Sequence, residues 1–291
     1  MKLSNNVISI EVDPHGAELV SLVRKGREYM WNGDAKFWNR RAPILFPAVG
    51  KPFNNEIRID GQVFTMKQHG FARDCEFEEA GDGLLRMKDV HPENYPYRFA
   101  LEAQYKLEGN RVDITWTVKN LDKRDLYAQI GAHPAFQMPD YDPADAVHGY
   151  VRYLDHEGRP FRPVVVSDLA DGNRVPLPEP VHLPAEMPVT GETFAHDAWI
   201  IEEMQVASTE LLDKQGNPYG WGVAKYTTPE KYYGKAFTDA VYRRKPEESK
   251  ARLLSHFRKI LPWASEKQLL KLLGLSLAGK LFGESLRFNM I

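Results

Sequence analysis

Two neighbouring stretches of the chain alternate apolar and polar residues with a period of two. In RVDITWTVKN, residues 111–120, one parity holds Val112, Ile114, Trp116 and Val118. In YRFALEAQYKLEGN, residues 97–110, the apolar parity holds Phe99, Leu101, Ala103, Tyr105 and Leu107. This period is typical of strands with one face in a core and one face in water. Residues 108–110 form a short turn signal, so an antiparallel hairpin is predicted.

Further strand candidates recur along the first two hundred residues, separated by Gly, Pro and Asp turn signals. They are residues 7–12, 56–59, 63–66, 84–89 and 199–202. Many short strands with little helix predict an all-β fold, an antiparallel β-sandwich. Residues 139–188 are rich in Pro and Asp and are expected to form a long excursion of loops and strands. Long loops on a sheet scaffold are where sites are usually built.

The C-terminal part has a different character. The last 72 residues hold 14 Lys/Arg and 6 Asp/Glu, a net of +8, which leaves −10 for residues 1–219. Leu253, Leu254, Phe257 and Ile260 follow helical spacing, and Ser265 with Gln268 resembles a capping box before a Leu-rich run. We therefore expect residues 1–219 to form the β-sandwich. Residues 220–291 are expected to be an atypical, basic, helix-patterned tail that completes this domain or is appended to it.

Composition excludes several classes of partner and site. The net charge of −2 gives no reason to expect nucleic acid or an anionic membrane, and no apolar run reaches spanning length. The single cysteine, Cys75, excludes an intrachain disulfide and a Cys-rich metal site. P-loop, G-x-S-x-G and G-x-G-x-x-G motifs are absent. A soluble, reduced, cytoplasmic protein is the expectation.

Two of the nine histidines stand out by their context. His69 in KQHGFARD and His133 in GAHPAF each follow a predicted strand. Pro134 restricts His133 to an extended backbone, which directs its side chain off the sheet. No H-x-H or H-x-x-x-H pair occurs, so zinc is disfavoured. From the residues alone, an active-site pair competes with histidines that serve packing or loops.

A set of motifs, taken in order, resembles the aldose 1-epimerase (galactose mutarotase) family in its short, single-domain bacterial branch. These are APILFPAVGK, NNEIRIDGQVF, QHGFARD, GAHPAF and FAHDAWII, between about Val7 and about Pro218. The resemblance implies a β-sandwich of the galactose mutarotase type that holds a hexose in an open cleft on one sheet. It also implies an isomerase that interconverts α and β anomers by acid/base ring opening, without a metal or cofactor.

The resemblance also assigns roles to residues. His133 matches the general acid that protonates the ring oxygen, and His69 matches the second active-site histidine, which hydrogen-bonds sugar oxygens. Asp197 matches the family aspartate that accepts hydrogen bonds from sugar hydroxyls, and Arg73, in the same motif as His69, is expected to donate to such hydroxyls. Lys51 stands where the family has an arginine, and we do not transfer that role because Lys lacks the planar fork of Arg.

The family's general base, a Glu near the C-terminus, has no counterpart in the sequence. The nearest string is KILPWAS, in which Leu261 occupies its place. Three interpretations stay open. The tail is a divergent replacement in which Glu230, Glu247 or Glu248 supplies the carboxylate, or it results from an altered reading frame or a rearranged chain. In the third interpretation the protein binds sugar without converting it.

The alternative function is therefore a non-catalytic carbohydrate-binding protein. An epimerase of hexose 6-phosphates is a third possibility, with Arg40, Arg41 and Lys51 as candidate phosphate ligands. Exposed aromatics at Phe37, Trp38 and Phe71 could stack on a sugar or serve packing. The identity of the sugar and the oligomeric state are not determined by the sequence.

Overall fold

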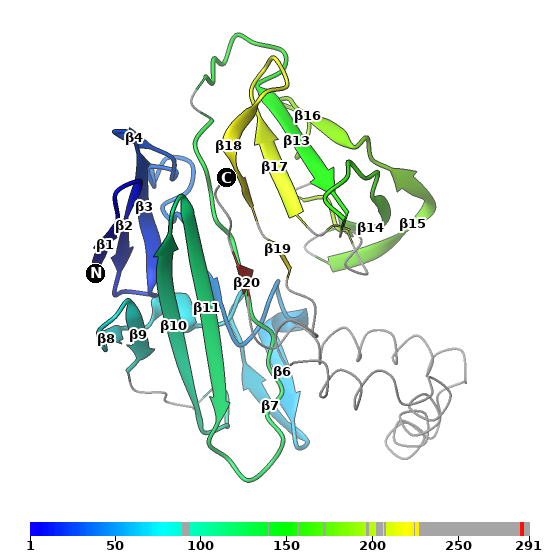
Figure 1. The fold of residues 1–291 in the computed structure, drawn as a ribbon. Coiled ribbons are helices and arrows are strands. Elements are labelled where there is room, and N and C mark those ends of the chain that lie inside the picture. The colour runs from blue at the N-terminus through cyan, green and yellow to red at the C-terminus, as the bar shows by residue number, and fades with distance from the viewer. Residues whose placement is uncertain are drawn as a thin grey trace. The chain divides into compact units, whose positions relative to one another are not determined.

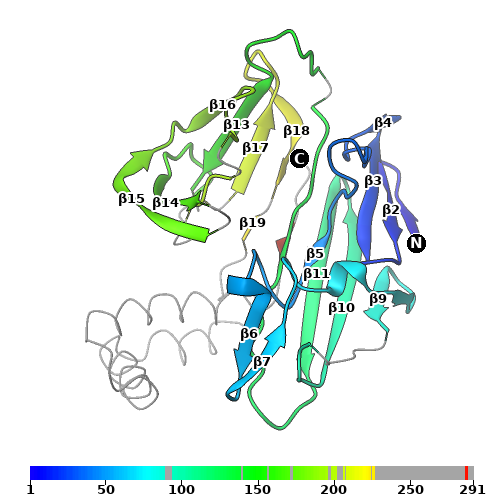
Figure 2. The same ribbon diagram turned by 180° about the vertical axis from the view of Figure 1, so that it is seen from behind.

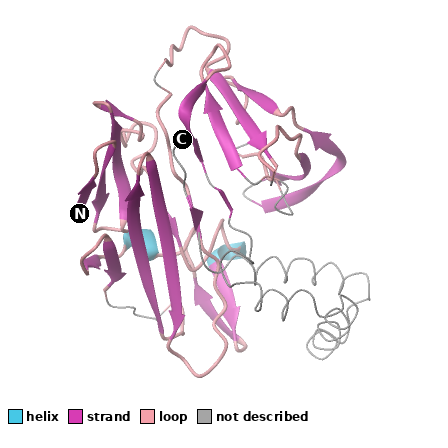
Figure 3. Cartoon of the chain, viewed as in Figure 1, coloured by secondary structure: helices cyan, strands magenta, loops and turns pink. Residues whose placement is uncertain are grey.

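The structure is a computed structural model, and the regular secondary structure that it describes consists almost entirely of strands, which loops and turns connect (Figure 3). It describes residues 1–88, 94–138, 140–155, 157–170, 173–195, 198–201, 206, 208–223, 225–226 and 286–287. These belong to one compact unit, Met1–Tyr226 with Ser285–Ile291. The predicted tail helices lie outside the described residues, and the boundary after residue 219 stays a prediction.

Every strand pair among the described residues is antiparallel, as the sequence predicts. One sheet has the order β1-β2-β3-β4, formed by Lys2–Ser4, Ile8–Asp13, Glu18–Arg24 and Arg27–Glu28. A second has the order β11-β10-β9-β8, formed by Arg111–Asn120, Phe99–Glu108, Leu84–Met87 and Phe77–Glu79. A third has the order β16-β13-β17-β18, formed by Glu186–Val189, Gly149–Leu154, Ser208–Leu212 and Pro218–Val223.

Four two-stranded pairs complete the described strands. They are β5 with β12 (Ile44–Leu45, Gly131–Ala132), β6 with β7 (Glu56–Ile59, Gln62–Thr65), β14 with β15 (Val164–Ala170, Asn173–His182) and β19 with β20 (Lys225–Tyr226, Leu286–Arg287). Figure 2 shows the β6–β7 hairpin from behind. Helical structure in the described ranges is limited to two 3-10 turns, η1 (Phe53–Asn55) and η2 (Ala72–Asp74). None of the helices described there is long and apolar enough to cross a bilayer.

The hairpin predicted from the two-residue period is the long pair β10–β11 (Figure 1). Its register places Ala103 opposite Trp116, so the apolar residues of both strands lie on one face of the sheet. The residues of that face from Phe99 to Tyr105 and from Val112 to Trp116 are buried, while Leu107 and Val118 near the strand ends are partly exposed. The prediction of this hairpin is confirmed.

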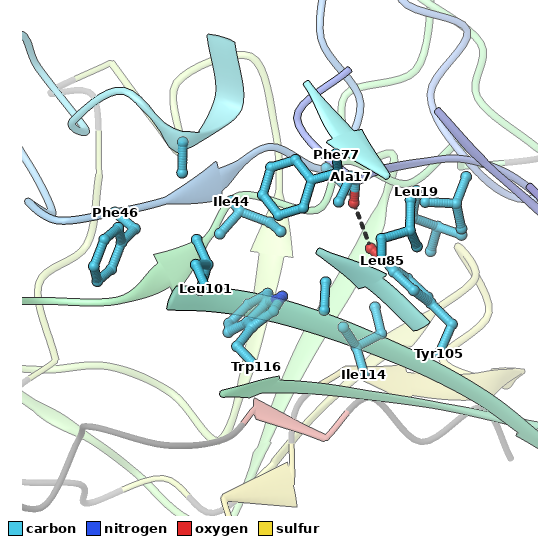
Figure 4. Packing of buried hydrophobic residues seen from close by; sticks show 14 of the residues in the cluster. Ala17, Leu19, Ile44, Phe46, Phe77, Leu85, Leu101, Tyr105, Ile114 and Trp116 are labelled. Atoms are coloured by element: carbon cyan, nitrogen blue, oxygen red, sulfur yellow. Dashed lines mark hydrogen bonds between the residues drawn. The ribbon is translucent and has the colours of Figure 1, made fainter. Parts of the chain in front are cut away.

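The main core lies on this face. Trp116 and Leu101 pack in one cluster with Ile44 and Phe77 (Figure 4). Tyr105 is fully enclosed, with 2% of its surface exposed, and its hydroxyl donates a 2.7 Å hydrogen bond to the backbone oxygen of Ala17. Burial raises the pKa of the Tyr105 phenol, so the group stays a neutral donor.

A smaller cluster joins residues of the stretch 139–188, which the sequence assigns to an excursion of loops and strands, with one residue beyond it. It contains Tyr153, Val165, Leu183, Met187 and Val206. Residues 139–188 are more regular than a loop-rich segment, because β13 to β16 begin within them. The strand predicted at 199–202 is not formed in the described residues 199–201, where Ile201 makes only an isolated bridge to Val165.

A short central segment connects distant parts of the main core. β5 pairs with β12, and the next residue, Phe46, forms a parallel bridge with Gly70. The Phe46 backbone oxygen accepts hydrogen bonds from the N–H groups of Phe71 and Ala72 at 2.9 and 3.1 Å. A Cβ on Gly70 would lie 2.1 Å from that same oxygen, so only glycine permits this approach.

Replacing Tyr105 with Phe is expected to destabilise the chain by about 1–3 kcal/mol, because the Ala17 oxygen loses its buried donor. Urea unfolding followed by fluorescence measures the change. Tyr127→Phe is the control, since that side chain is 67% exposed. Equal stability of the two variants would contradict the role given to the Tyr105 hydroxyl.

Gly70→Ala should cost roughly 2–5 kcal/mol, the sum of a left-handed backbone at an alanine and overpacking against a carbonyl. Gly61→Ala is the matched control, because Gly61 has a similar φ of +79° against +72° but no atom within 4 Å of an added Cβ. Thermal unfolding of both variants tests the difference. A Gly70→Ala variant no less stable than Gly61→Ala would refute the close approach at Phe46.

Candidate active site

The structure brings together the two histidines that the sequence singles out. Their Nε2 atoms lie 3.4 Å apart, and the ring centroids are 4.6 Å apart with the rings perpendicular. His69 follows β7, His133 follows β12, and 64 residues of chain separate them. His133 is exposed and His69 is half-buried. A contact of this kind gives two imidazole nitrogens access to one small molecule.

His133 is positioned by the pairing of β12 with β5. Gly131 lies opposite Leu45 and Ala132 opposite Ile44. Beyond the pair, the His133 N–H donates to the Pro43 oxygen at 3.3 Å. His133 therefore directly follows a short strand pair in which β5 is buried and β12 is half-buried, and its side chain is exposed.

His69 is positioned by the same central segment, a few residues further along. Its backbone N–H donates to the Gly50 oxygen at 2.9 Å, and its ring Nδ1 accepts the Gly50 N–H at 3.0 Å. His69 and Gly70 have φ values of +66° and +72°, so the chain turns sharply here. Residues 43–50 thus hold both histidines, one at each end.

Aromatic side chains anchor this turn in the core. Phe71 packs against Phe46, Tyr95 and Phe99, with ring centroids 6.2–6.5 Å apart. The Tyr95 hydroxyl donates to the Tyr127 oxygen at 2.6 Å, and burial raises the pKa of Tyr95. Of the two uses considered for Phe71, stacking or packing, these contacts favour packing.

The other candidate aromatics lie in a separate loop. Phe37 is exposed and meets Trp31 edge-on, with ring centroids 6.2 Å apart, and Lys36 lies over its ring. Trp38 is half-buried, and its backbone oxygen accepts the Trp31 indole N–H at 2.8 Å. These contacts are internal to the loop and leave a sugar-stacking role for Phe37 or Trp38 as a prediction.

Arg73 supports the turn that carries His69. Its Nη2 donates to the Gln68 oxygen at 2.9 Å, immediately before His69. Burial, followed by the nearby Arg40 guanidinium, lowers the pKa of Arg73. Arg40 in turn donates to the Arg73 oxygen at 2.9 Å and pairs with Asp74.

Asp197, the fourth predicted site residue, lies outside the described residues.

Two further residues hold the site and were not identified from the sequence. Gly50 supplies the N–H that meets His69, and the Gln129 side-chain oxygen accepts the neighbouring Val49 N–H at 2.9 Å. The Gln129 N–H also donates to the Pro47 oxygen at 2.9 Å. The glycine in PAVGK signals a turn, but no pattern indicates which ring nitrogen its amide reaches.

Within the described ranges, no group of three or more His, Cys, Asp or Glu could hold a metal ion.

The tail region resembles a different family from the body. A family model described as AlkZ related matches residues 203–274. This match includes Leu261 and the three candidate carboxylates at 230, 247 and 248. It overlaps the part of the chain in which the charge and the residue pattern change.

Known relatives and solved structures resemble most of the chain. The chromosomal LacX protein of Lactococcus lactis subsp. lactis is 29% identical over 234 residues, covering 74% of this chain and 76% of that protein; the plasmid form is 28% identical. A galactose mutarotase related enzyme from Lactobacillus acidophilus has a TM-score of 0.66 at 25% identity, covering 77% of this chain and 75% of its own. A galactose mutarotase-like protein from Lactobacillus casei has a TM-score of 0.61 at 26% identity, covering 74% and 76%.

These structural likenesses confirm the predicted antiparallel all-β fold of the galactose mutarotase type. The model of the aldose 1-epimerase family matches residues 1–183, more than half of the chain, including both histidines and the segment that joins them. The chain therefore belongs to the aldose 1-epimerase family.

Proposed function

We propose that the chain interconverts the α and β anomers of an aldose, with His133 as the general acid and His69 as a hydrogen-bond donor to the same sugar. The observation that carries this proposal is the 3.4 Å approach of the two Nε2 atoms. Membership of the aldose 1-epimerase family supplies the reaction class. The geometry supplies two groups that can meet one oxygen of the substrate.

The reaction fits an exposed imidazole. A base takes the anomeric O–H proton, the bond between C1 and the ring oxygen breaks, and an acid gives its proton to that oxygen. Rotation about C1–C2 and the reverse steps close the ring as the other anomer. An imidazole has an unperturbed pKa near working pH, so it can donate and recover this proton. One positioned acid contributes on the order of 10²–10⁴ in rate.

The second candidate function, a sugar-binding protein without turnover, rests on the AlkZ-related match. Aldose 1-epimerases that this chain resembles are expected to carry the base carboxylate in their C-terminal part. In this chain that part overlaps residues 203–274, which match the AlkZ-related family model instead. Leu261 cannot accept a proton. If no carboxylate from elsewhere replaces the missing base, the histidine pair binds sugar and ring opening is severely slowed.

The hexose 6-phosphate possibility is less well supported. Arg40 is paired with Asp74, and Arg41 donates to the Asn32 oxygen at 2.6 Å. Both guanidiniums thus already have partners inside the protein. Lys51 is exposed, and solvated surface charge remains the simpler interpretation of its position.

Anomer interconversion of glucose and galactose, followed by polarimetry or saturation-transfer NMR, tests the proposal. The full chain should exceed the spontaneous rate, and His133→Gln should lose about 10²–10⁴-fold of the catalysed rate, because glutamine cannot donate and recover the proton. His182→Gln, which removes an exposed histidine at the end of β15, should leave the rate unchanged.

The other outcomes separate the two candidate functions. Saturable sugar binding at the spontaneous rate, weakened by His133→Gln, would support the binding protein. Catalysis that survives His133→Gln would remove His133 from the acid role. Absence of both turnover and binding would contradict both functions.

A further inference from the structure

The contact between His69 and Gly50 has a direction that restricts the chemistry of the His69 ring. The Gly50 N–H points at Nδ1 with a nitrogen–nitrogen distance of 3.0 Å. The pair is reciprocal, because the His69 N–H donates to the Gly50 oxygen at 2.9 Å. Two hydrogen bonds between the same two residues fix both the backbone and the ring.

A backbone N–H can only donate, so Nδ1 must present its lone pair. In a neutral imidazole one nitrogen accepts and the other carries the proton. The proton of neutral His69 therefore sits on Nε2, the atom that faces His133. Turning the ring over would put carbon atoms at both contacts and lose both, so the orientation is fixed by two independent partners.

We infer that the Gly50 amide is a positioning group that holds His69 as the Nε2–H tautomer, a hydrogen-bond donor that is not a base. This inference rests on the proposed function and adds a division of roles to it. His69 Nε2–H donates, and the Nε2 of neutral His133 accepts at 3.4 Å. His133 is then the member of the pair that gains and loses the proton.

The division favours a particular kind of substrate atom. When His133 also carries a proton on Nε2, two N–H donors face each other and their mutual hydrogen bond is lost. An oxygen that only accepts can receive hydrogen bonds from both. The ring oxygen of a cyclic aldose has lone pairs and no proton, so it matches a pair of donors better than a hydroxyl does.

The same contact argues against a metal ion between the rings. Two nitrogens of a tetrahedral zinc site lie about 3.3–3.4 Å apart when each Zn–N bond is about 2.0–2.1 Å, so the spacing alone would suit zinc. However, His69 could ligate through Nε2 only with its proton on Nδ1, where the Gly50 N–H already points. Zinc binding would require that hydrogen bond to break.

Nitrogen-15 NMR of the histidine-labelled full chain tests the tautomer directly, at about pH 8 where imidazoles are ordinarily neutral. His69→Asn and His133→Asn assign the signals. The expected spectrum of His69 has a protonated Nε2 and an unprotonated Nδ1, unchanged when Zn²⁺ is added. A protonated Nδ1, an averaged pair of nitrogens, or loss of the Nε2–H signal with Zn²⁺ would overturn the inference.

Two substitutions of Gly50 test the amide itself. The φ of Gly50 is +84° and no atom lies within 4 Å of an added Cβ, so the variants differ in backbone preference rather than packing. Asparagine tolerates this conformation and should keep the fixed tautomer, whereas valine disfavours it and should give an averaged His69 spectrum. Identical spectra in both folded variants would overturn the role of Gly50.

The readout separates this inference from the function on which it rests. The tautomer of His69 is measured without sugar, so a chain that fails to interconvert anomers can still show the fixed Nε2–H form. Conversely, a catalytic chain with an averaged His69 would keep the proposed function and lose the positioning role. If Gly50→Val does not fold, the spectrum of the unsubstituted chain decides the question.

Discussion

The backbone oxygen of Phe46 accepts two N–H groups, from Phe71 and Ala72, at a place where Gly70 leaves room for the approach. This arrangement joins the turn that carries His69 to the short strand β5. Because β5 pairs on its other side with β12, the same segment also places His133. The proximity of the two histidines is thus a consequence of backbone hydrogen bonds around one short strand, β5.

The sequence predicts the parts of this arrangement that depend on local pattern. The two-residue period of residues 99–107 and 112–118 reflects burial of one face, so it identifies the β10–β11 hairpin and its core residues. The contexts of His69 and His133, each after a strand and beside Gly or Pro, likewise single out the two rings. The resemblance to the aldose 1-epimerase family adds the expectation that the two histidines belong to one active site.

Other features depend on contacts that have no local pattern. The amide of Gly50 reaches a ring 19 residues away, and Gln129 supports the neighbouring Val49 from 80 residues away. The strand predicted at 199–202 has apolar residues but finds only one bridge partner in its described part, Val165. Arg73 donates to the carbonyl of Gln68 in the turn that carries His69, a contact that the sequence does not indicate, while its role in sugar binding stays a prediction. Most of these contacts join residues that are far apart in the sequence, so a local residue pattern does not predict them.

The proposed ring opening requires one sugar to contact both imidazoles. A crystal structure of the full chain with glucose or galactose bound measures this most directly. We expect the ring oxygen to lie within hydrogen-bond distance, about 2.7–3.2 Å, of Nε2 of both His69 and His133. A sugar held at another surface, or one whose ring oxygen contacts neither imidazole, would contradict it.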